Sequence, residues 1–358
     1  MVIGVKTQSR IKEVEVSGTP YGMGFQYGSA CPEIGKMFEL TCEACKLERD
    51  AAISLSPKYI PFIEEYSPEI ASEMKGMAEG ARVDLREIVF LNIWYELSLR
   101  GCMGGCTSFA ASGEGTNDGE LIIGQNLDMT PAWDEMLVLL KMKPSRGPKI
   151  LAVTPVGLLG LLSLNSAGLA LDGNMLAHKD LMGFSEGVPH MVWVRKAQSA
   201  ENIGKAIAAI ASAKKTGVAV NTLLGSQEGD IVDIEVTPDD LGFLYPQKGF
   251  IVHSNHFYTE RFKSRDLMGT LLPDSYVRSQ RLATLMERHR GELSTDVMRE
   301  LLTDHNNHPD SICRHVDRDA PPELQIKTVA SVISYPKEQK MYIAYGNPCE
   351  KEYVEYKL

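Results

Sequence analysis

The stretch RGCMGGCTSFAASGEGTNDGELIIGQNLDM, from Arg100 to Met129, marks the point where the chain changes from helical to strand-forming sequence. Gly104 and Gly105 remove side-chain bulk from the backbone directly before Cys106, which suits a backbone that something approaches closely. Small hydroxyl residues follow, and then two short apolar segments joined by a turn, a pattern typical of a pair of strands. The segment is therefore interpreted either as an ordinary tight loop or as a peptide bond that is meant to be attacked.

Helical patterns dominate the sequence before this stretch, after a short extended start. The segment SPEIASEMKGMAEGARV opens with Ser67 as the N-cap and Pro68 at the first helical position. Residues 84–100, DLREIVFLNIWYELSLR, begin with Asp84 and Glu87 spaced as a capping box. Because apolar residues cover most of its circumference, this segment is predicted to be one well-buried helix that leads directly to the Gly-Cys segment.

Strand patterns dominate after Cys106. One hairpin is predicted to turn at Glu228-Gly229, and a second closes the chain in TVASVISYPKEQKMYIAYG. Helices are predicted in SAENIGKAIAAIASAKK, with Ser199 as its cap, and in SYVRSQRLATLMERHRG and STDVMRELLTDH. Two groups of strands with helices between them predict a layered α+β architecture. The other predicted strands are ELIIGQNLDM, MLVLLKM, KILAVTPVG, LLSLN, GLALDGNML and GFIVHSNHF.

The composition is that of a globular protein, with 44% hydrophobic and 23% charged residues among 358. A formal net charge of -10 argues against a nucleic-acid-binding surface, which needs clustered Lys and Arg. The sequence contains no signal-peptide pattern at its start and no apolar run of membrane-spanning length. We therefore expect a cytoplasmic protein that is not bound to a membrane. The seven cysteines are an odd number scattered along the chain, so free thiols rather than a disulfide framework are expected.

Cys106 has three interpretations. It is a buried structural cysteine, or a papain-like thiolate activated by His253, His256 or His305, or a nucleophile whose base is its own α-amino group. The third requires cleavage of the Gly105–Cys106 bond, and it accounts for the unobstructed glycine carbonyl. A free α-amino group has a pKa of roughly 8, close enough to neutrality to accept a thiol proton.

A series of motifs gives the segment a wider context. GTPYGMGFQYG, SPEIASEMKGMAEGARVD, GCTSF, GQNLD, GLLSLNSAGLALDGNML, HSNHF, HPDSICRH and the closing TVASVISYP…AYGNPC follow one another along the chain. In this order the sequence resembles the acyl-coenzyme A:6-aminopenicillanic acid acyltransferase family, the autoproteolytic peptidase family C45 of the N-terminal nucleophile hydrolases. The resemblance covers almost the whole chain. It implies an α+β fold, a four-layer αββα sandwich in which helices cover two stacked antiparallel sheets.

The resemblance also assigns residues. It implies that Cys106 is the nucleophile, and that Gly105 ends a fragment of residues 1–105 that stays packed against the catalytic fragment 106–358. Asp128 matches the acidic residue that the family places beside the nucleophile, where it could orient the α-amino group. Asn255 matches the oxyanion-hole asparagine, whose amide stabilises developing negative charge.

Several further positions are implied by subgroups of the family. Asn174 resembles a second oxyanion contact of the bile-salt and penicillin V hydrolases. Arg314 is similar to a functional arginine of the acyltransferase branch and Arg278 to one of the hydrolase branch, although either could be an ordinary surface arginine. Thr107 is a further candidate for a supporting or substrate-binding residue. Gln125 stands where the bile-salt hydrolases carry arginine, which argues against bile salts as substrates.

The resulting hypothesis is an enzyme that cleaves or forms linear amide C–N bonds through a cysteinyl thioester. Its substrate would be a small-molecule acyl amide, and coenzyme A thioester could be a co-substrate, but the resemblance implies no metal or organic cofactor. Hydrolysis is the default because water is always available, and a coenzyme A-dependent N-acyltransferase is the alternative. A catalytically silent binding module is disfavoured because Cys106, Asp128 and Asn255 are all retained.

A metal-binding protein is the rival hypothesis from another class. His305, His308, Cys313 and His315 supply zinc-compatible side chains within eleven residues. Their spacing fits neither a standard zinc finger nor HExxH, and the same stretch is one of the motifs of the family.

Overall fold

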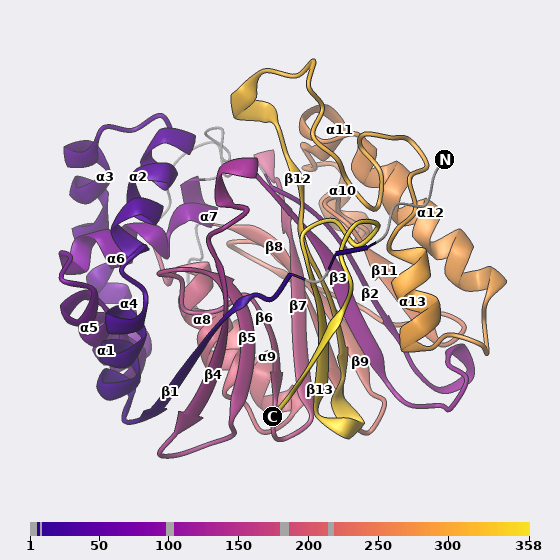
Figure 1. Ribbon diagram of the computed structural model, residues 1–358, viewed down its shortest axis with the longest axis horizontal. Coiled ribbons are helices and arrows are strands. Elements are labelled where there is room, and N and C mark those ends of the chain that lie inside the picture. Colours follow the sequence, from indigo (N-terminus) through magenta and orange to yellow (C-terminus); the bar gives the residue numbers. More distant parts are fainter. Residues whose placement is uncertain (1–5, 8, 98–103, 180–185, 214–217) are drawn as a thin grey trace.

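Two stacked β-sheets form the centre of the molecule (Figure 1), which was obtained as a computed structural model. The structure describes residues 6–7, 9–97, 104–179, 186–213 and 218–358. The eight-stranded sheet has the order β1-β4-β5-β6-β7-β8-β9-β10, and the six-stranded sheet has the order β11-β2-β3-β12-β13-β14. Neighbouring strands are antiparallel except β1 and β4, which are parallel.

The strands of the first sheet are β1 (Lys12–Gly18), β4 (Leu137–Pro144), β5 (Ile150–Pro155), β6 (Leu162–Asn165), β7 (Leu169–Leu176), β8 (Ala219–Ser226), β9 (Ile231–Val236) and β10 (Leu241–Leu244). Those of the second sheet are β2 (Gly105–Ala111), β3 (Ile122–Met129), β11 (Phe250–His253), β12 (Lys327–Tyr335), β13 (Lys340–Tyr345) and β14 (Val354–Lys357). The predicted hairpins β8–β9 and β12–β13 are confirmed.

Strands β2 and β3 are buried along their whole length, which explains why their sequences lack polar alternation. One face of this pair contacts β7 and β8 of the other sheet. The other face packs under α12 (Asp274–Arg288) and α13 (Thr295–Leu301), where Phe109 and Ile122 join the apolar side chains of the two helices. The pair that carries the Gly-Cys segment therefore lies in the interior of the fold.

Helices complete the outer layers. On the eight-stranded sheet, α8 (His190–Gln198) and α9 (Ile203–Ser212) contact β6, β7 and β8. With α12 and α13 on the six-stranded sheet, the layers are helix, sheet, sheet and helix. The expected four-layer αββα sandwich is therefore confirmed. Two short helices, α10 (Glu260–Lys263) and α11 (Met268–Leu271), precede α12.

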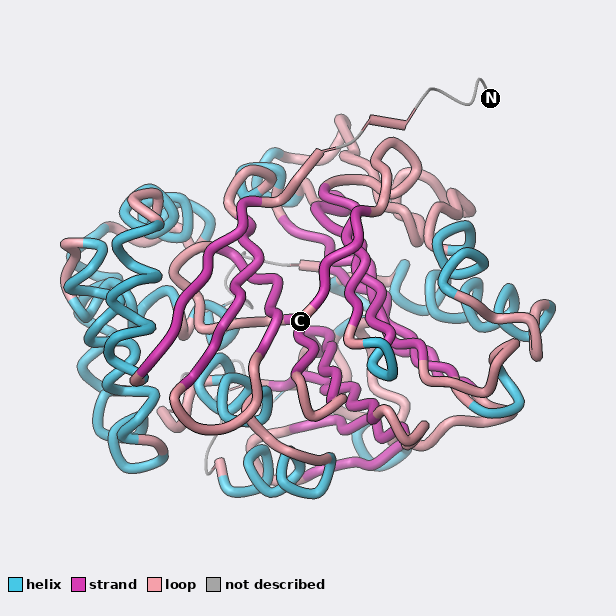
Figure 2. Tube along the Cα trace, turned by 60° about the horizontal axis from the view of Figure 1, so that its bottom comes forward, coloured by secondary structure: helices cyan, strands magenta, loops and turns pink. Residues whose placement is uncertain are grey.

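The helices in the described part of the first hundred residues gather on one side of the molecule, beside β1 and β4 (Figures 1 and 2). They are α1 (Pro20–Ala30), α2 (Ile34–Ala44), α3 (Arg49–Leu55), α4 (Ile60–Tyr66), α5 (Pro68–Ala81), α6 (Leu85–Leu91) and α7 (Trp94–Leu97). Helix α5 begins as predicted, because the Ser67 hydroxyl accepts a hydrogen bond from the Ile70 amide. The capping box of Asp84 and Glu87 is confirmed at α6. None of the helices within the described ranges is long and apolar enough to cross a membrane.

The single helix predicted over residues 84–100 is wrong, because the described part is divided at Asn92. The Asn92 side-chain amide donates to the carbonyls of Ile88 and Gly157, and its oxygen accepts from the Leu159 amide. These bonds tie the end of α6 to the β5–β6 connection, and a side chain that bonds backbone groups in this way competes with helix continuation.

The predicted cap of the next helix is also wrong. Ser199 ends α8, a helix that the sequence analysis missed, and Asn202 caps α9 by accepting from the Lys205 amide. The cysteines require a further correction, because Cys45 is disulfide-bonded whereas the other described cysteines are free. A single disulfide bond depends on which cysteines are close in space, and the spacing of cysteines along the sequence does not reveal this.

Helices α1 and α5 approach each other so closely that their backbones touch. A Cβ atom at Gly24 would overlap the carbonyl oxygen of Glu73, and one at Gly76 would overlap that of Tyr21. The residues at this contact lie four apart in each helix and so share one face. They are Gly24 and Gly28 in α1 and Gly76 and Gly80 in α5.

Replacing one of these glycines should therefore destabilise the fold. We expect Gly24→Ala and Gly76→Ala each to lower the free energy of unfolding by about 1–3 kcal/mol, because neither backbone can yield without separating the helices. Urea unfolding of Cys106→Ala chains, in which the expected cleavage cannot occur, measures the change.

Gly35, in the first turn of α2, is the matched control because nothing lies within 4 Å of its added Cβ. Gly35→Ala should be neutral or stabilising by up to about 1 kcal/mol. An equal loss at all three positions would contradict close helix contact as the cause.

Candidate active site

Cys106 is the second residue of β2 and is only 3% exposed. In the antiparallel register with β3, Gly105 lies opposite Asp128 and Cys106 opposite Leu127. The tight-loop interpretation is therefore wrong for these residues, because they begin a buried strand.

Gly105 allows a carboxylate to lie directly against the expected cleavage site. A Cβ atom at this position would be 3.2 Å from Asp128 Oδ2 and 3.7 Å from Arg278 Nη2. The first separation is tighter than most real Cβ contacts, so a side chain here would push the carboxylate away. Glycine therefore serves a close approach at this site rather than a turn.

Arg278 connects most of the predicted site residues. Its Nη1 donates to the carbonyl oxygen of Cys106 at 2.7 Å and to Thr107 Oγ1 at 2.8 Å. Its Nη2 donates to Asn255 Oδ1 at 2.8 Å, and its Nε donates to Asp274 Oδ2 at 2.7 Å. The side chain is fully buried, so Arg278 is not a surface arginine.

Asn255 presents its amide oxygen, not its amide nitrogen, to Cys106. Its Oδ1 accepts from the Cys106 backbone nitrogen at 3.0 Å and from Arg278. Both partners are donors, so the orientation of the amide is determined by its contacts. The Nδ2 atom donates to the Met175 carbonyl at 3.0 Å and has one further hydrogen to give. Asn255 therefore holds the nitrogen atom that cleavage before Cys106 would release.

Asn174 carries a buried donor whose partner is missing within the described part of the chain. Its Oδ1 accepts from Ser108 Oγ at 2.6 Å, and its backbone nitrogen donates to Asn221 Oδ1 at 2.7 Å. Its Nδ2 has no hydrogen-bond partner among the described residues. An unpaired buried donor costs free energy, and it is available to an oxyanion that forms nearby.

Asp128 has one carboxylate oxygen that accepts a hydrogen bond and one that lies beside Gly105. Oδ1 accepts from Thr328 Oγ1 at 2.7 Å, and Oδ2 lies 3.6 Å from Arg314 Nε. Burial raises the pKa of Asp128 to about 6, although Arg314 and Arg278 both act to lower it. The carboxyl group can therefore gain or lose a proton close to neutral pH.

Arg314 is as buried as Arg278 and belongs to the same cluster of charges. Its guanidinium pairs with Asp274 and, at 3.0 Å, with Asp310 Oδ1. The two arginines that the sequence analysis assigned to different branches thus share Asp274. The analysis missed Asp274 itself, for which the signal was its position four residues before Arg278 on one helix.

The histidines proposed for a papain-like site are engaged elsewhere. His253 Nε2 bonds to Glu235 at 2.9 Å, and His256 Nδ1 bonds to Ser275 Oγ at 2.8 Å. None of the hydrogen bonds of these two rings within the described residues reaches Cys106. Burial, with a smaller effect of Asp128, raises the pKa of the Cys106 thiol to about 12. The third candidate, His305, contacts His315. Among the described residues, none of the three candidate imidazoles therefore bonds to Cys106.

The metal-binding stretch is only partly as the sequence predicts. His305, Cys313 and His315 come together, whereas His308 does not join them and Cys349 does. Cys349 lies 34 residues beyond His315, so no local spacing could have indicated it.

Comparison with known proteins places the chain in context. A family model described as acyl-coenzyme A:6-aminopenicillanic acid acyl-transferase matches residues 115–350, a segment that begins nine residues after Cys106. The 40 kDa form of acyl-coenzyme A:6-aminopenicillanic-acid-acyltransferase from Emericella nidulans is 28% identical over 309 residues, which cover 84% of each chain. An uncharacterized protein from Archaeoglobus fulgidus is 24% identical over 348 residues, and these cover 81% of this chain but 57% of that protein.

Solved structures are similar at lower identity. A mutant conjugated bile acid hydrolase from Clostridium perfringens is 13% identical with a TM-score of 0.44, and the match covers 72% of this chain and 97% of that one. Penicillin V acylase from Agrobacterium tumefaciens is 13% identical with a TM-score of 0.45, covering 67% and 83%.

The contacts of Arg278 predict a large effect of its removal. Arg278→Gln should lower the free energy of unfolding by about 3–5 kcal/mol, because it leaves the buried Asp274 carboxylate short of a positive partner. Arg281, one turn further along α12, is 31% exposed and pairs with Asp304, so Arg281→Gln should cost at most about 1 kcal/mol. Thermal and urea unfolding compare the two, and similar losses would contradict the central position of Arg278.

Proposed function

Because the chain belongs to the acyl-coenzyme A:6-aminopenicillanic acid acyl-transferase family, we propose that it is an autoproteolytic N-terminal-cysteine enzyme acting on linear amide C–N bonds. The observation that carries the proposal is the Gly105–Cys106 bond, held among Asp128, Asn255 and Arg278 in a buried strand. The thiol of Cys106 is the proposed nucleophile in both self-cleavage and catalysis.

Self-cleavage begins when Cys106 Sγ attacks the carbonyl carbon of Gly105. A C–S bond forms as the C–N bond breaks, and the thiol proton passes to the departing nitrogen. Water then hydrolyses the thioester, which leaves a carboxylate on Gly105 and a free amine and thiol on Cys106. Asp128 is the base that relays the proton, because its carboxylate lies against Gly105 and its pKa of about 6 leaves it ionised at neutral pH.

Cleavage supplies a second base, one that is part of Cys106 itself. With its pKa raised to about 12, Cys106 is protonated at neutral pH and is a poor nucleophile toward an external amide. The α-amino group released by cleavage has an ordinary pKa of roughly 8 and is adjacent to the thiol. Asn255 Oδ1, which accepts from this nitrogen in the intact chain, keeps the new amine in place.

The catalytic cycle then repeats the same chemistry on a substrate. The Cys106 thiol attacks the acyl carbonyl while its α-amino group takes the proton, and the amine product leaves with that proton. Asn174 Nδ2, which has no partner among the described residues, donates to the oxyanion, assisted by the remaining hydrogen of Asn255 Nδ2. We propose hydrolysis of the resulting thioester, since water needs no site of its own, and transfer to an amine or to coenzyme A is the alternative.

The fragment of residues 1–105 would stay bound after cleavage. Its strand β1 pairs with β4 along seven consecutive residue pairs, and its helix α1 packs on β1 and β4. Apolar residues from both sides of the cleavage site share one core. Loss of one peptide bond leaves these contacts intact.

Intact-mass spectrometry under denaturing conditions tests the cleavage. We expect two fragments whose masses sum to the full chain plus one water, the larger beginning at Cys106, whereas Cys106→Ala remains one chain. Cys42→Ala removes another buried free thiol and should still cleave. A folded wild-type chain that stays whole on incubation would contradict the mechanism.

The same preparations test the activity. A panel of N-acyl amides should release free amine with the cleaved wild type and not with Cys106→Ala. Addition of coenzyme A or a second amine distinguishes the two outcomes, because transfer yields a new thioester or amide in place of the free acid. Cleavage without turnover of any amide would restrict the proposal to self-processing.

The pKa of Asp128 predicts the pH dependence of cleavage. Below about pH 6 its carboxyl group is protonated and cannot accept the thiol proton, so the rate should fall about tenfold per pH unit. With an aspartate of ordinary pKa, the rate would stay constant until the pH fell to about 4. Asp128→Asn should slow cleavage by about 10²–10⁴-fold and abolish the fall near pH 6. If the cleavage rate of Asp128→Asn also fell below about pH 6, the fall would be caused by the titration of another group.

A further inference from the structure

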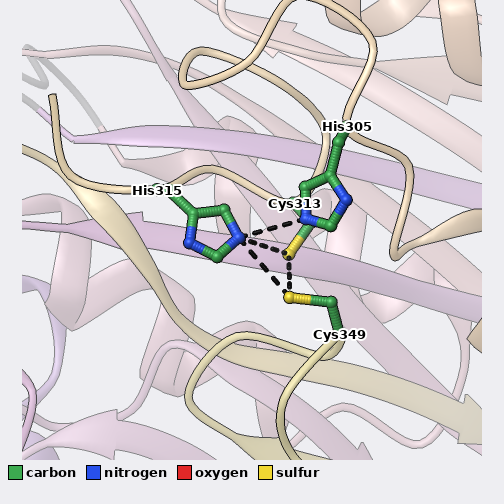
Figure 3. Close-up of side chains that lie close together, drawn as sticks. All are labelled: His305, Cys313, His315 and Cys349. Atoms are coloured by element: carbon green, nitrogen blue, oxygen red, sulfur yellow. Dashed lines mark hydrogen bonds between the residues drawn. The ribbon is translucent and has the colours of Figure 1, made fainter. Parts of the chain in front are cut away.

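Two histidines and two cysteines from segments far apart in the sequence converge in one place (Figure 3). His305, Cys313 and His315 lie in the connection after α13, and Cys349 lies between β13 and β14. Each offers one ligand atom, and these atoms all lie within 4.8 Å of one another. The family chemistry proposed above uses none of the four.

Four of the six separations between the ligand atoms are close to the edges of a tetrahedron around one metal ion, and the other two are at most 4.8 Å. His305 Nε2 and His315 Nε2 are 3.1 Å apart, and the two sulfur atoms are 3.5 Å apart. His315 Nε2 is 3.8 Å from Cys313 Sγ and 3.4 Å from Cys349 Sγ. Zinc bonds of about 2.0–2.1 Å to nitrogen and about 2.3 Å to sulfur give tetrahedral edges of roughly 3.3–3.8 Å.

We propose that His305, Cys313, His315 and Cys349 bind one structural Zn²⁺ ion. Two thiolates and two imidazoles in a tetrahedron are the donor set that zinc prefers. Four protein ligands complete the coordination and leave no position for substrate, which makes the ion structural rather than catalytic. Both cysteines are free thiols, with their sulfur atoms well beyond the length of a disulfide bond.

The ion would hold Arg314 in position, because two of its ligands are the residues on either side of Arg314. The Arg314 backbone is also fixed by Thr328 Oγ1, which accepts from its nitrogen, and by Asn347 Nδ2, which donates to its oxygen at 2.7 Å. Asn347 Nδ2 lies 3.5 Å from Cys313 Sγ as well, so it can bond a thiolate ligand from outside the coordination sphere. Zinc would thereby join the C-terminal segment to the arginine that pairs with Asp128.

Access from solvent is provided by a cavity of about 580 Å³ whose lining includes His308, His315 and Asn347. His305, His315 and Cys349 are partly exposed and only Cys313 is buried. A metal ion can therefore reach the ligands in the folded chain, without unfolding of the sandwich.

Metal analysis of the full chain tests the proposal directly. The protein is purified without a histidine tag under reducing conditions, and zinc is measured by plasma mass spectrometry. We expect about one zinc per chain, and at least a tenfold lower content in His305→Ala and Cys349→Ser. His308→Ala is the matched control: the His308 ring packs beside the rings of His305 and His315 but supplies no ligand atom, so this variant should retain most of the zinc.

A second readout avoids variants that fail to fold. Wild-type protein stripped of metal and given Co²⁺ should show tetrahedral d–d absorption and thiolate-to-cobalt charge transfer, and Zn²⁺ should displace both. A zinc content below about one tenth per chain with no cobalt spectrum would overturn the proposal. So would equal loss of zinc in His308→Ala, or a Cys313–Cys349 disulfide in freshly reduced protein.

The result does not depend on the proposed enzymatic function. Cys106→Ala, which should not cleave, is expected to bind as much zinc as the wild type because Cys106 is not a ligand. A wild-type chain that binds zinc but does not cleave would therefore refute only the proposed enzyme. A chain that cleaves but binds no zinc would refute only the proposed metal site.

Discussion

The buried ion pairs of Arg278 and Arg314 with one shared carboxylate, Asp274, are the interaction on which the site depends. Charged groups removed from water are tolerated only when they are paired and hydrogen-bonded. Each arginine therefore requires its acidic partners, and the partners require the arginines. Because Arg278 also donates to the Cys106 carbonyl, the same ion pairs hold the backbone next to the expected cleavage site.

Cys106, the proposed nucleophile, is buried beside the same charged groups. Asp128 lies between Gly105 and Arg314, so that its proton affinity reflects both burial and the nearby guanidinium groups. A thiol in the same environment remains protonated. The intact chain thus combines a carboxylate that can accept a proton near neutral pH with a cysteine that stays protonated.

Local signals in the sequence predicted local structure well. The caps at Ser67 and at Asp84, and the turn of the β8–β9 hairpin, depend on residues a few positions apart, and all three are confirmed. Signals failed where distant segments decide the outcome. Asn92 ends α6 because it bonds a connection 65 residues away. No local pattern in the sequence indicates that β1 pairs with β4, or that Arg314 shares the partner of Arg278.

The candidate site shows the same difference between contacts made within neighbouring segments and contacts made between distant ones. The structure brings together Gly105, Cys106 and Asp128, which the resemblance singled out and whose proximity follows from the pairing of two strands that are adjacent in the sequence. The orientation of the Asn255 amide could not be predicted, because it depends on two donors from other elements. The approach of Cys349 to the histidines likewise arises only when β13 and β14 fold onto the sheet.

The parallel pairing of β1 with β4 has a consequence for the molecularity of folding. In a cleaved protein the two strands of this pair would belong to separate polypeptides, so one sheet would be shared between two chains. Unfolding would then produce two molecules from one, and its midpoint would rise with protein concentration, as in an obligate dimer. Dilution, which leaves a single chain unaffected, would favour dissociation of the mature form.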